Sequence, residues 1–204
     1  MKIIVFGASG GIGQQVVQQA LSANHEVTAF VRDPAKLALQ HPLLTIVQGD
    51  GLDEQAVVSA IPGHDAVLCC VGSRGLGSTT LMSDIMRHVI TGMNNSGVTR
   101  IAYVASAGIH KELKGIVGGL AGLLLKNVLA DHHRAFELLQ KSDLDWSVAR
   151  PMSLTNGEQT GIYRESQTGI PKKGQKISRA DVAHFLLKAI TENAYIHQSV
   201  GLVY

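Results

Sequence analysis

The sequence is poor in cysteine, aromatic residues and charge, and these shortages exclude several classes of protein. Its two cysteines, Cys69 and Cys70, are adjacent in an apolar stretch of a chain of 204 residues. Because neighbouring side chains of a strand point to opposite faces, a disulfide between them would be strained. We therefore interpret both as reduced core residues, with a redox pair as the alternative.

Charged residues make up only 17% of the chain, and the formal net charge is +2 without any basic run. So weak a charge does not favour nucleic acid or an anionic membrane as a partner. No metal-ligand spacing is visible, so we predict no metal site. The first residues enter a strand directly, without the features of a secretory signal, and we therefore expect a cytoplasmic protein.

A strand, a glycine-rich turn and a helix follow one another at the start of the chain. The apolar run 2–6 breaks at Gly7, and the spacing G-x-x-G-x-x-G continues through Gly10 and Gly13. Ser9 stands where the strict dinucleotide pattern has another glycine. Such glycines let the chain turn tightly, let a pyrophosphate approach the backbone, and let the helix lie close to the sheet. This context predicts a dinucleotide-binding turn whose N–H groups hold phosphates; a glycine-rich turn without a ligand is the alternative.

Strand-like and helix-like patterns alternate along most of the chain. After the first strand, apolar strand patterns cover 26–31, 44–47, 66–71, 100–105, 145–149 and 201–203, and helical patterns cover 53–61, 79–96 and 131–141. A capping box at 178–181 opens a last helix. This alternation is typical of a parallel sheet covered on both faces. We therefore predict a doubly wound parallel sheet, a single Rossmann-like α/β domain over 1–204 with a small C-terminal substrate region.

Residues 106–130 form the least regular part of the chain. The apolar stretch there is interrupted by Gly115, Gly118, Gly119 and Gly122 and by Lys114 and Lys126. A segment broken in this way does not suit a bilayer span. We expect a lid over the site or an oligomer contact, with a plain core helix as the alternative, and the oligomeric state stays open.

The end of the second predicted strand indicates which dinucleotide binds. Arg32 lies nineteen residues beyond Gly13, where the ribose of the cofactor is expected, and its planar fork suits a 2′-phosphate. Lys36 could add a second positive charge. Asp33 is the counter-argument, because an acidic residue there would hold the 2′-hydroxyl of NAD. We favour NADP(H), with solvated surface charge as the alternative for Lys36.

Two further strand ends carry candidate cofactor contacts. Asp50 follows the third strand, where folds of this type contact the adenine ring; a simple turn residue is the alternative. Val71, Gly72 and Arg74 follow the fourth strand, and a glycine there lets the backbone pass close to the cofactor. Another turn is the alternative.

The chain lacks the tyrosine and lysine pair with which short-chain dehydrogenases protonate a carbonyl. Its tyrosines are at positions 103, 163, 195 and 204, and none has a lysine four residues later. A bound nicotinamide must therefore reduce an acceptor that needs little acid help, such as a flavin, a quinone or a conjugated tetrapyrrole.

Six tracts, read in order, are similar to the flavin reductase/biliverdin-IXβ reductase family, an NmrA-like, atypical short-chain dehydrogenase/reductase group that binds NAD(P)H. They are 72–84, 105–107, 130–132, 147–153, 161–163 and 177–185, and the similarity covers almost the whole chain. The resemblance matches Gly7, Ser9, Gly10, Gly11, Ile12 and Gly13 to the phosphate turn, Arg32 to the arginine that selects NADPH, and Asp50, Val71, Gly72 and Arg74 to other cofactor contacts.

The resemblance also implies residues of the reaction site. It places Ser106 beside the nicotinamide, with a strand-end cap as the alternative, and His132 near the substrate pocket, with a surface histidine at a helix start as the alternative. We also place Pro151 and Met152 at the cofactor. Mammalian members of the family have a histidine at the position of Met152, which here offers an apolar contact to a flat ring instead.

The resemblance implies an NADPH-dependent reductase that transfers hydride to a small planar acceptor, with a flavin as the first candidate. The alternative is a non-catalytic, NADP(H)-sensing regulator of the NmrA-like type. An epimerase or lyase of the extended short-chain group is a third interpretation. The missing tyrosine and the absence of a substantial C-terminal domain argue against it.

Overall fold

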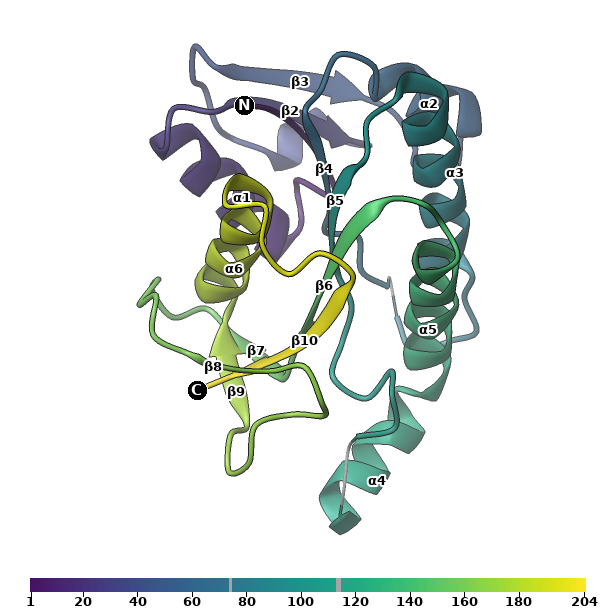
Figure 1. The fold of residues 1–204 in the computed structure, drawn as a ribbon, viewed down its shortest axis with the longest axis vertical. Coiled ribbons are helices and arrows are strands. Elements are labelled where there is room, and N and C mark those ends of the chain that lie inside the picture. Colours follow the sequence, from purple (N-terminus) through teal and green to yellow (C-terminus); the bar gives the residue numbers. More distant parts are fainter. Residues whose placement is uncertain (74, 113–114) are drawn as a thin grey trace.

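The computed structural model describes residues 1–73, 75–112 and 115–204, which form one large sheet with helices on both faces (Figure 1). Within these residues the strands lie in the order β3-β2-β1-β4-β5-β6-β10-β8. The bounds are β1 Lys2–Phe6, β2 Glu26–Val31, β3 Leu44–Gln48, β4 Ala66–Cys69, β5 Arg100–Val104, β6 Asp145–Pro151, β8 Arg164–Ser166 and β10 Gln198–Val203. All neighbours pair in parallel except β10 and β8. The predicted doubly wound, Rossmann-like α/β fold is confirmed.

Helices lie on both faces of the sheet, as Figure 1 shows. The bounds are α1 Gly11–Ser22, α2 Glu54–Ala60, α3 Leu81–Ser96, α4 Gly115–Leu124, α5 Lys126–Gln140 and α6 Arg179–Thr191. Side chains of α1 and α6 pack in one apolar cluster, and those of α2, α3 and α5 pack in the other. Strands β4 and β5 are buried along their whole length, which explains their continuous apolar sequences.

The order of the strands fixes where a ligand can bind. Successive connections lead outward from β1 through β2 to β3 on one side, and from β4 through β5 to β6 on the other. The direction of winding therefore reverses between β1 and β4. Helices leave the carboxyl ends of these two strands on opposite faces, so a crevice opens between them. The glycine turn after β1 lies at this point.

The structure differs from the sequence prediction at several boundaries. Strand β4 ends at Cys69 rather than at residue 71, and α5 begins at Lys126 rather than at residue 131. A second, two-stranded parallel sheet of β7 (Ser153–Thr155) and β9 (Lys176–Ser178) was not predicted, nor was the antiparallel β8. Strands of three residues are too short to give a recognisable alternation.

The predicted capping box at the start of α6 is confirmed in one half only. The Ser178 Oγ accepts a hydrogen bond from the Asp181 backbone N–H (2.9 Å). The buried Asp181 carboxylate does not return to the Ser178 N–H; it accepts hydrogen bonds from Thr160, Gly161 and the Tyr204 hydroxyl instead. The start of α6 is therefore tied to the loop after β7 and to the last residue of the sequence.

Across the described residues, the structure contains no helix with the length and apolarity needed to cross a membrane.

Candidate functional site

A cleft opens at the carboxyl ends of β1, β2, β3 and β4. Of the residues predicted to bind the cofactor, seven line it together: Gly7, Ser9, Gly10, Arg32, Asp50, Val71 and Gly72. The prediction did not include Phe6, Phe30, Val31, Gly49, Gly51, Cys70, Leu81 and Ile85, which complete the wall. Residues that are distant in sequence thus meet where the topology places a ligand.

The glycine turn can be built only with glycine at two of its positions. Gly7 has φ +77°, and a Cβ there would lie 2.7 Å from the carbonyl carbon of Cys70. A Cβ on Gly13 would lie 2.2 Å from the Gly7 oxygen. Gly7 therefore lets the chain turn beside β4, and Gly13 lets α1 start directly against that turn.

The start of α1 presents bare backbone toward the cleft. Its N-cap is Gly10, which has no side chain to accept from the first N–H groups of the helix. Ile12, on the opposite side of this first turn, is 8% exposed and anchors the helix in the core. The Ser9 carbonyl accepts a hydrogen bond from the Gln14 side chain (3.0 Å), which holds the turn in place. This geometry suits an anion.

Arg32 and Asp33, the two candidates for recognising the ribose, differ in their surroundings. Arg32 is exposed and lines the cleft at the end of β2. The Asp33 Oδ1 accepts a hydrogen bond from the Ala35 N–H (3.1 Å) and so caps the short 3₁₀ turn Pro34–Lys36. Its Oδ2 lies 3.8 Å from the Lys36 Nζ. Lys36 does not line the cleft, and Asp33 is already engaged by its own turn.

The far wall of the cleft is apolar and tightly packed. A Cβ on Gly49 would lie 2.4 Å from the Phe30 ring, and one on Gly51 would lie 2.8 Å from Ile85. Asp50, between the two glycines, accepts a hydrogen bond from the Leu52 N–H (3.1 Å), so it is both a turn residue and a cleft residue.

The strand end at 70–72 corrects one prediction. Cys69 is buried in the core as expected, but Cys70, directly after β4, is only partly buried: it packs against the core and also lines the cleft. Burial raises the pKa of the Cys70 thiol, and the neighbouring Cys69 adds to the rise, so the thiol stays protonated at neutral pH. A Cβ on Gly72 would meet open space. Arg74 lies outside the described residues.

Ser106, Pro151 and Met152 lie at the carboxyl ends of β5 and β6, next along the same edge of the sheet. The Ala107 N–H donates to the Pro151 carbonyl (3.0 Å), which places Ser106 beside the end of β6. The half-buried Ser106 hydroxyl donates to the Ala107 carbonyl (3.1 Å). Met152 is half-buried and its N–H donates to the Leu202 carbonyl (3.2 Å). None of the three lines the cleft described above, so their contact with the cofactor stays a prediction.

His132 is not a surface residue, so that alternative is wrong. Its side chain is buried at 6% exposure, and its Nδ1 is hydrogen-bonded to the Tyr103 hydroxyl of β5 (2.5 Å). Burial lowers the pKa of His132 to about 4, although the Asp131 carboxylate opposes the shift. His132 is therefore neutral at physiological pH and does not donate a proton as an imidazolium.

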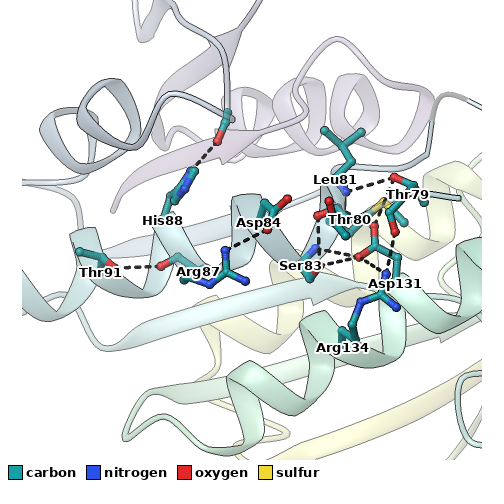
Figure 2. Close-up of polar contacts among 12 residues, drawn as sticks. Thr79, Thr80, Leu81, Ser83, Asp84, Arg87, His88, Thr91, Asp131 and Arg134 are labelled. Atoms are coloured by element: carbon teal, nitrogen blue, oxygen red, sulfur yellow. Dashed lines mark hydrogen bonds and ion pairs between the residues drawn. The ribbon is translucent and has the colours of Figure 1, made fainter.

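Asp131, which the sequence analysis did not select, caps the neighbouring helix α3 (Figure 2). Its buried carboxylate accepts hydrogen bonds from the Met82 N–H (2.9 Å), the Ser83 N–H (3.3 Å) and the Ser83 hydroxyl (2.6 Å). The N-cap residue Thr80 makes no side-chain cap of its own. Asp131 thus fixes the start of α3, where Leu81 lines the cleft.

The first part of the predicted lid is anchored to the sheet. Glu112 forms a buried ion pair with Arg150 of β6. Arg150 also donates from Nε to the Ser199 hydroxyl (2.9 Å), and burial lowers its pKa to about 10, which leaves it a cation at neutral pH. Glu112 is therefore tied to β6 in this structure. Leu113 and Lys114 lie outside the described residues, and a lid over the remainder stays a prediction.

The chain matches a known protein family and is similar to known proteins. A family model described as NAD(P)H-binding matches residues 7–193, which is most of the chain. The isoflavone reductase homolog IRL of Zea mays is 30% identical over 125 residues, a match that covers 57% of this chain and 38% of that protein. The chain therefore spans well under half of the length of this relative.

Two solved structures resemble the chain over its whole length. ChuY, described as an anaerobillin reductase from Escherichia coli O157:H7, has a TM-score of 0.82 at 23% identity and covers 100% of this chain and 97% of its own. A short-chain dehydrogenase/reductase from Veillonella parvula, solved in complex with NADP, has a TM-score of 0.84 at 17% identity, with coverage of 100% and 94%. At these identities the likeness establishes the fold.

Proposed function

The chain belongs to the NAD(P)H-binding family, and from this premise we propose that it is an NADPH-dependent reductase that transfers hydride to a small planar acceptor. The observation that carries the proposal is the cleft itself, which joins the bare glycine turn to the exposed Arg32. A guanidinium at this end of the cleft suits a 2′-phosphate, whereas Asp33 is occupied by its own turn.

The residues present fit a dinucleotide. The N-cap Gly10 has no side chain to accept from the first N–H groups of α1, so these groups would be left to bind a pyrophosphate. The apolar wall of Phe30, Leu81 and Ile85 suits an adenine ring. When bound, NADPH supplies the hydride.

The acid–base groups of the chain support an acceptor that needs little proton donation. No tyrosine is followed four residues later by a lysine, and His132 is buried and neutral. Ser106, at the end of β5, would orient the nicotinamide or an acceptor group through its hydroxyl. Met152 would offer a polarizable apolar contact to a flat ring. We therefore propose a flavin, a quinone or a conjugated tetrapyrrole as the acceptor. The description of ChuY as an anaerobillin reductase favours the tetrapyrrole.

A steady-state assay tests this proposal. The purified protein is mixed with NADPH or NADH and with FMN, riboflavin, a quinone series or a linear tetrapyrrole, while nicotinamide absorbance is followed. We expect turnover with at least one acceptor, faster with NADPH than with NADH, and reduced in Ser106→Ala. Arg87→Ala, an exposed arginine of α3 paired with Asp84, is the matched control. No NADPH oxidation with any acceptor would overturn the enzymatic proposal.

A non-catalytic NADP(H) sensor is the second candidate, and one observation favours it. Helix α4 exposes Leu120, Leu123 and Leu124 to solvent, each more than half exposed, which suits a protein partner. A sensor would bind NADP⁺ and NADPH with clearly different affinities and turn over no acceptor, whereas the reductase needs turnover.

We also propose a cytoplasmic location, where the reducing thiol pool would keep Cys69 and Cys70 unpaired.

A further inference from the structure

Arg179, the first residue of α6, lies across the start of α1. A Cβ built on Gly11 would lie 2.7 Å from the Arg179 Cδ and 2.8 Å from its Nε. Gly11 is the first residue of α1, directly after the N-cap Gly10. The guanidinium is therefore next to the helix N-terminus that faces the cleft, although Arg179 is far from the turn in sequence.

Three contacts hold Arg179 in this place. Its Nη1 donates to the Asn156 Oδ1 (2.7 Å), in the loop that follows β7. The Gln19 side chain, in the C-terminal half of α1, donates to the carbonyl of Ala180 (2.9 Å), which ties α1 to the start of α6. The Ser178 hydroxyl caps the helix that Arg179 begins. The side chain is half-buried rather than free in solvent.

The position is electrostatically unfavourable for a cation in the free protein. A helix N-terminus carries a partial positive charge, and Arg179 lies at the N-termini of both α1 and α6. Considering residues 1–73, 75–112 and 115–204 only, no acidic side chain is within ion-pair distance of its guanidinium. A bound anion at the start of α1 would turn this repulsion into an attraction.

We infer that Arg179 is a pyrophosphate-binding residue of the dinucleotide site. The glycine turn supplies backbone N–H groups but no charged side chain. Arg179 differs from Arg32, which acts on the 2′-phosphate alone. The inference rests on dinucleotide binding by this family and needs no knowledge of the hydride acceptor.

Titrations with three probes test this division of roles. NADP⁺ and NAD⁺ share the pyrophosphate, whereas adenosine 2′-monophosphate keeps the 2′-phosphate and lacks the pyrophosphate. Arg179→Ala should weaken NADP⁺ and NAD⁺ by the same factor, about 10- to 100-fold, the range for loss of a hydrogen bond to a charged group. It should leave adenosine 2′-monophosphate unchanged. Arg32→Ala should instead weaken the binding of NADP⁺ and adenosine 2′-monophosphate, which carry the 2′-phosphate, and leave NAD⁺ unchanged.

Stability measurements separate binding from a structural role. Arg179→Ala and Asn156→Ala both remove the same side-chain hydrogen bond, so their unfolding midpoints without ligand should agree. Only Arg179→Ala should also lose most of the stabilisation that saturating NADP⁺ gives the parent. If Arg179→Ala does not fold, Arg179→Lys and Arg179→Gln replace it, and the lysine variant should bind NADP⁺ more tightly than the glutamine variant.

Several results would overturn the inference. Unchanged or tighter NADP⁺ binding in Arg179→Ala would mean that the side chain only covers the turn, and equal lysine and glutamine variants would exclude a role of the charge. An equal loss for adenosine 2′-monophosphate would place Arg179 at the adenosine instead. Each of these leaves the reductase proposal intact, whereas Arg179-dependent binding without reduction of any acceptor would overturn only the reductase proposal.

Discussion

Replacement of Asp131 by alanine tests how the cleft is supported. In the structure both carboxylate oxygens of Asp131 are used, by the N–H groups of Met82 and Ser83 and by the Ser83 hydroxyl. Asp131→Ala leaves the two N–H groups at the start of α3 without an acceptor in a buried place (Figure 2). No side chain of the N-cap Thr80 replaces the lost acceptor.

The magnitude follows from these contacts. A buried donor left unpaired costs about 1–3 kcal/mol, and the loss of a negative charge near a helix N-terminus adds about 0.3–2 kcal/mol. With two such N–H groups, we therefore expect Asp131→Ala to lower the free energy of unfolding by about 2–8 kcal/mol. Asp131→Asn keeps one acceptor oxygen and should cost about 1–2 kcal/mol.

Urea unfolding followed by the fluorescence of Trp146 measures both variants, because this tryptophan is the sole one in the chain and is buried. Arg134→Ala removes the exposed partner of Asp131 together with its hydrogen bond to the Thr79 carbonyl (2.6 Å). It leaves the Asp131 cap of α3 in place and should cost less than about 1 kcal/mol, so it serves as the control. A loss below about 1 kcal/mol in Asp131→Ala would refute the assignment of Asp131 as the cap of α3. So would equal losses in the alanine and asparagine variants.

Three further predictions concern the cofactor turn and pH. Arg32→Ala should weaken NADPH by about 1.5–3 kcal/mol and NADH far less in parallel binding titrations; equal losses would remove the case for 2′-phosphate selection. Gly13→Ala places a Cβ 2.2 Å from the Gly7 oxygen, so it should weaken NADP⁺ at least about tenfold and lower the unfolding free energy by about 1–3 kcal/mol. Gly72→Ala, which meets open space, should leave stability unchanged, and similar stabilities for the two variants would contradict the reasoning. In the folded protein the pKa of His132 is lowered to about 4. The contribution of His132 to the free energy of unfolding is therefore complete above about pH 6.5 and is lost as the pH falls toward 4. Urea titrations should therefore show a loss of about 2 kcal/mol between pH 7.5 and 5 that is smaller in His132→Gln, and an equal loss in that variant would exclude His132 as its source.

The sequence predicted those parts of the fold that depend on local patterns. The glycine spacing from Gly7 to Gly13 and the continuous apolar strands depend on neighbours in sequence, and the structure has the turn and the sheet in the predicted places. Arg32, Asp50 and Gly72 could be placed because each follows a strand, and parallel strands end at the same edge of a sheet.

The surface alternative for His132 was wrong because the start of its helix was expected at residue 131. With a helix from residue 131, His132 belongs to an exposed first turn. Helix α5 begins at Lys126, and Asp131, His132, Ala135, Phe136 and Leu139 form its buried stripe. That spacing of three and four residues was visible in the sequence and would have indicated a buried face.

Other contacts of the site have no local signal. Asp131 meets Ser83 across 48 residues, and Glu112 meets Arg150 across 38. Arg179 lies beside Gly11 because α1 and α6 pack together on one face of the sheet (Figure 1). Such pairs depend on how distant segments of the chain pack, which no spacing in the sequence reports.

The measurement that tests the central claim most directly is a single turnover without oxygen. The protein, saturated with NADPH, is mixed with each planar acceptor, and nicotinamide and acceptor absorbance are followed together. The account predicts that for at least one acceptor the two signals change at the same rate, with one NADPH consumed for each acceptor that gains two electrons. NADPH that binds tightly but remains unoxidised with every flavin, quinone and tetrapyrrole would contradict it.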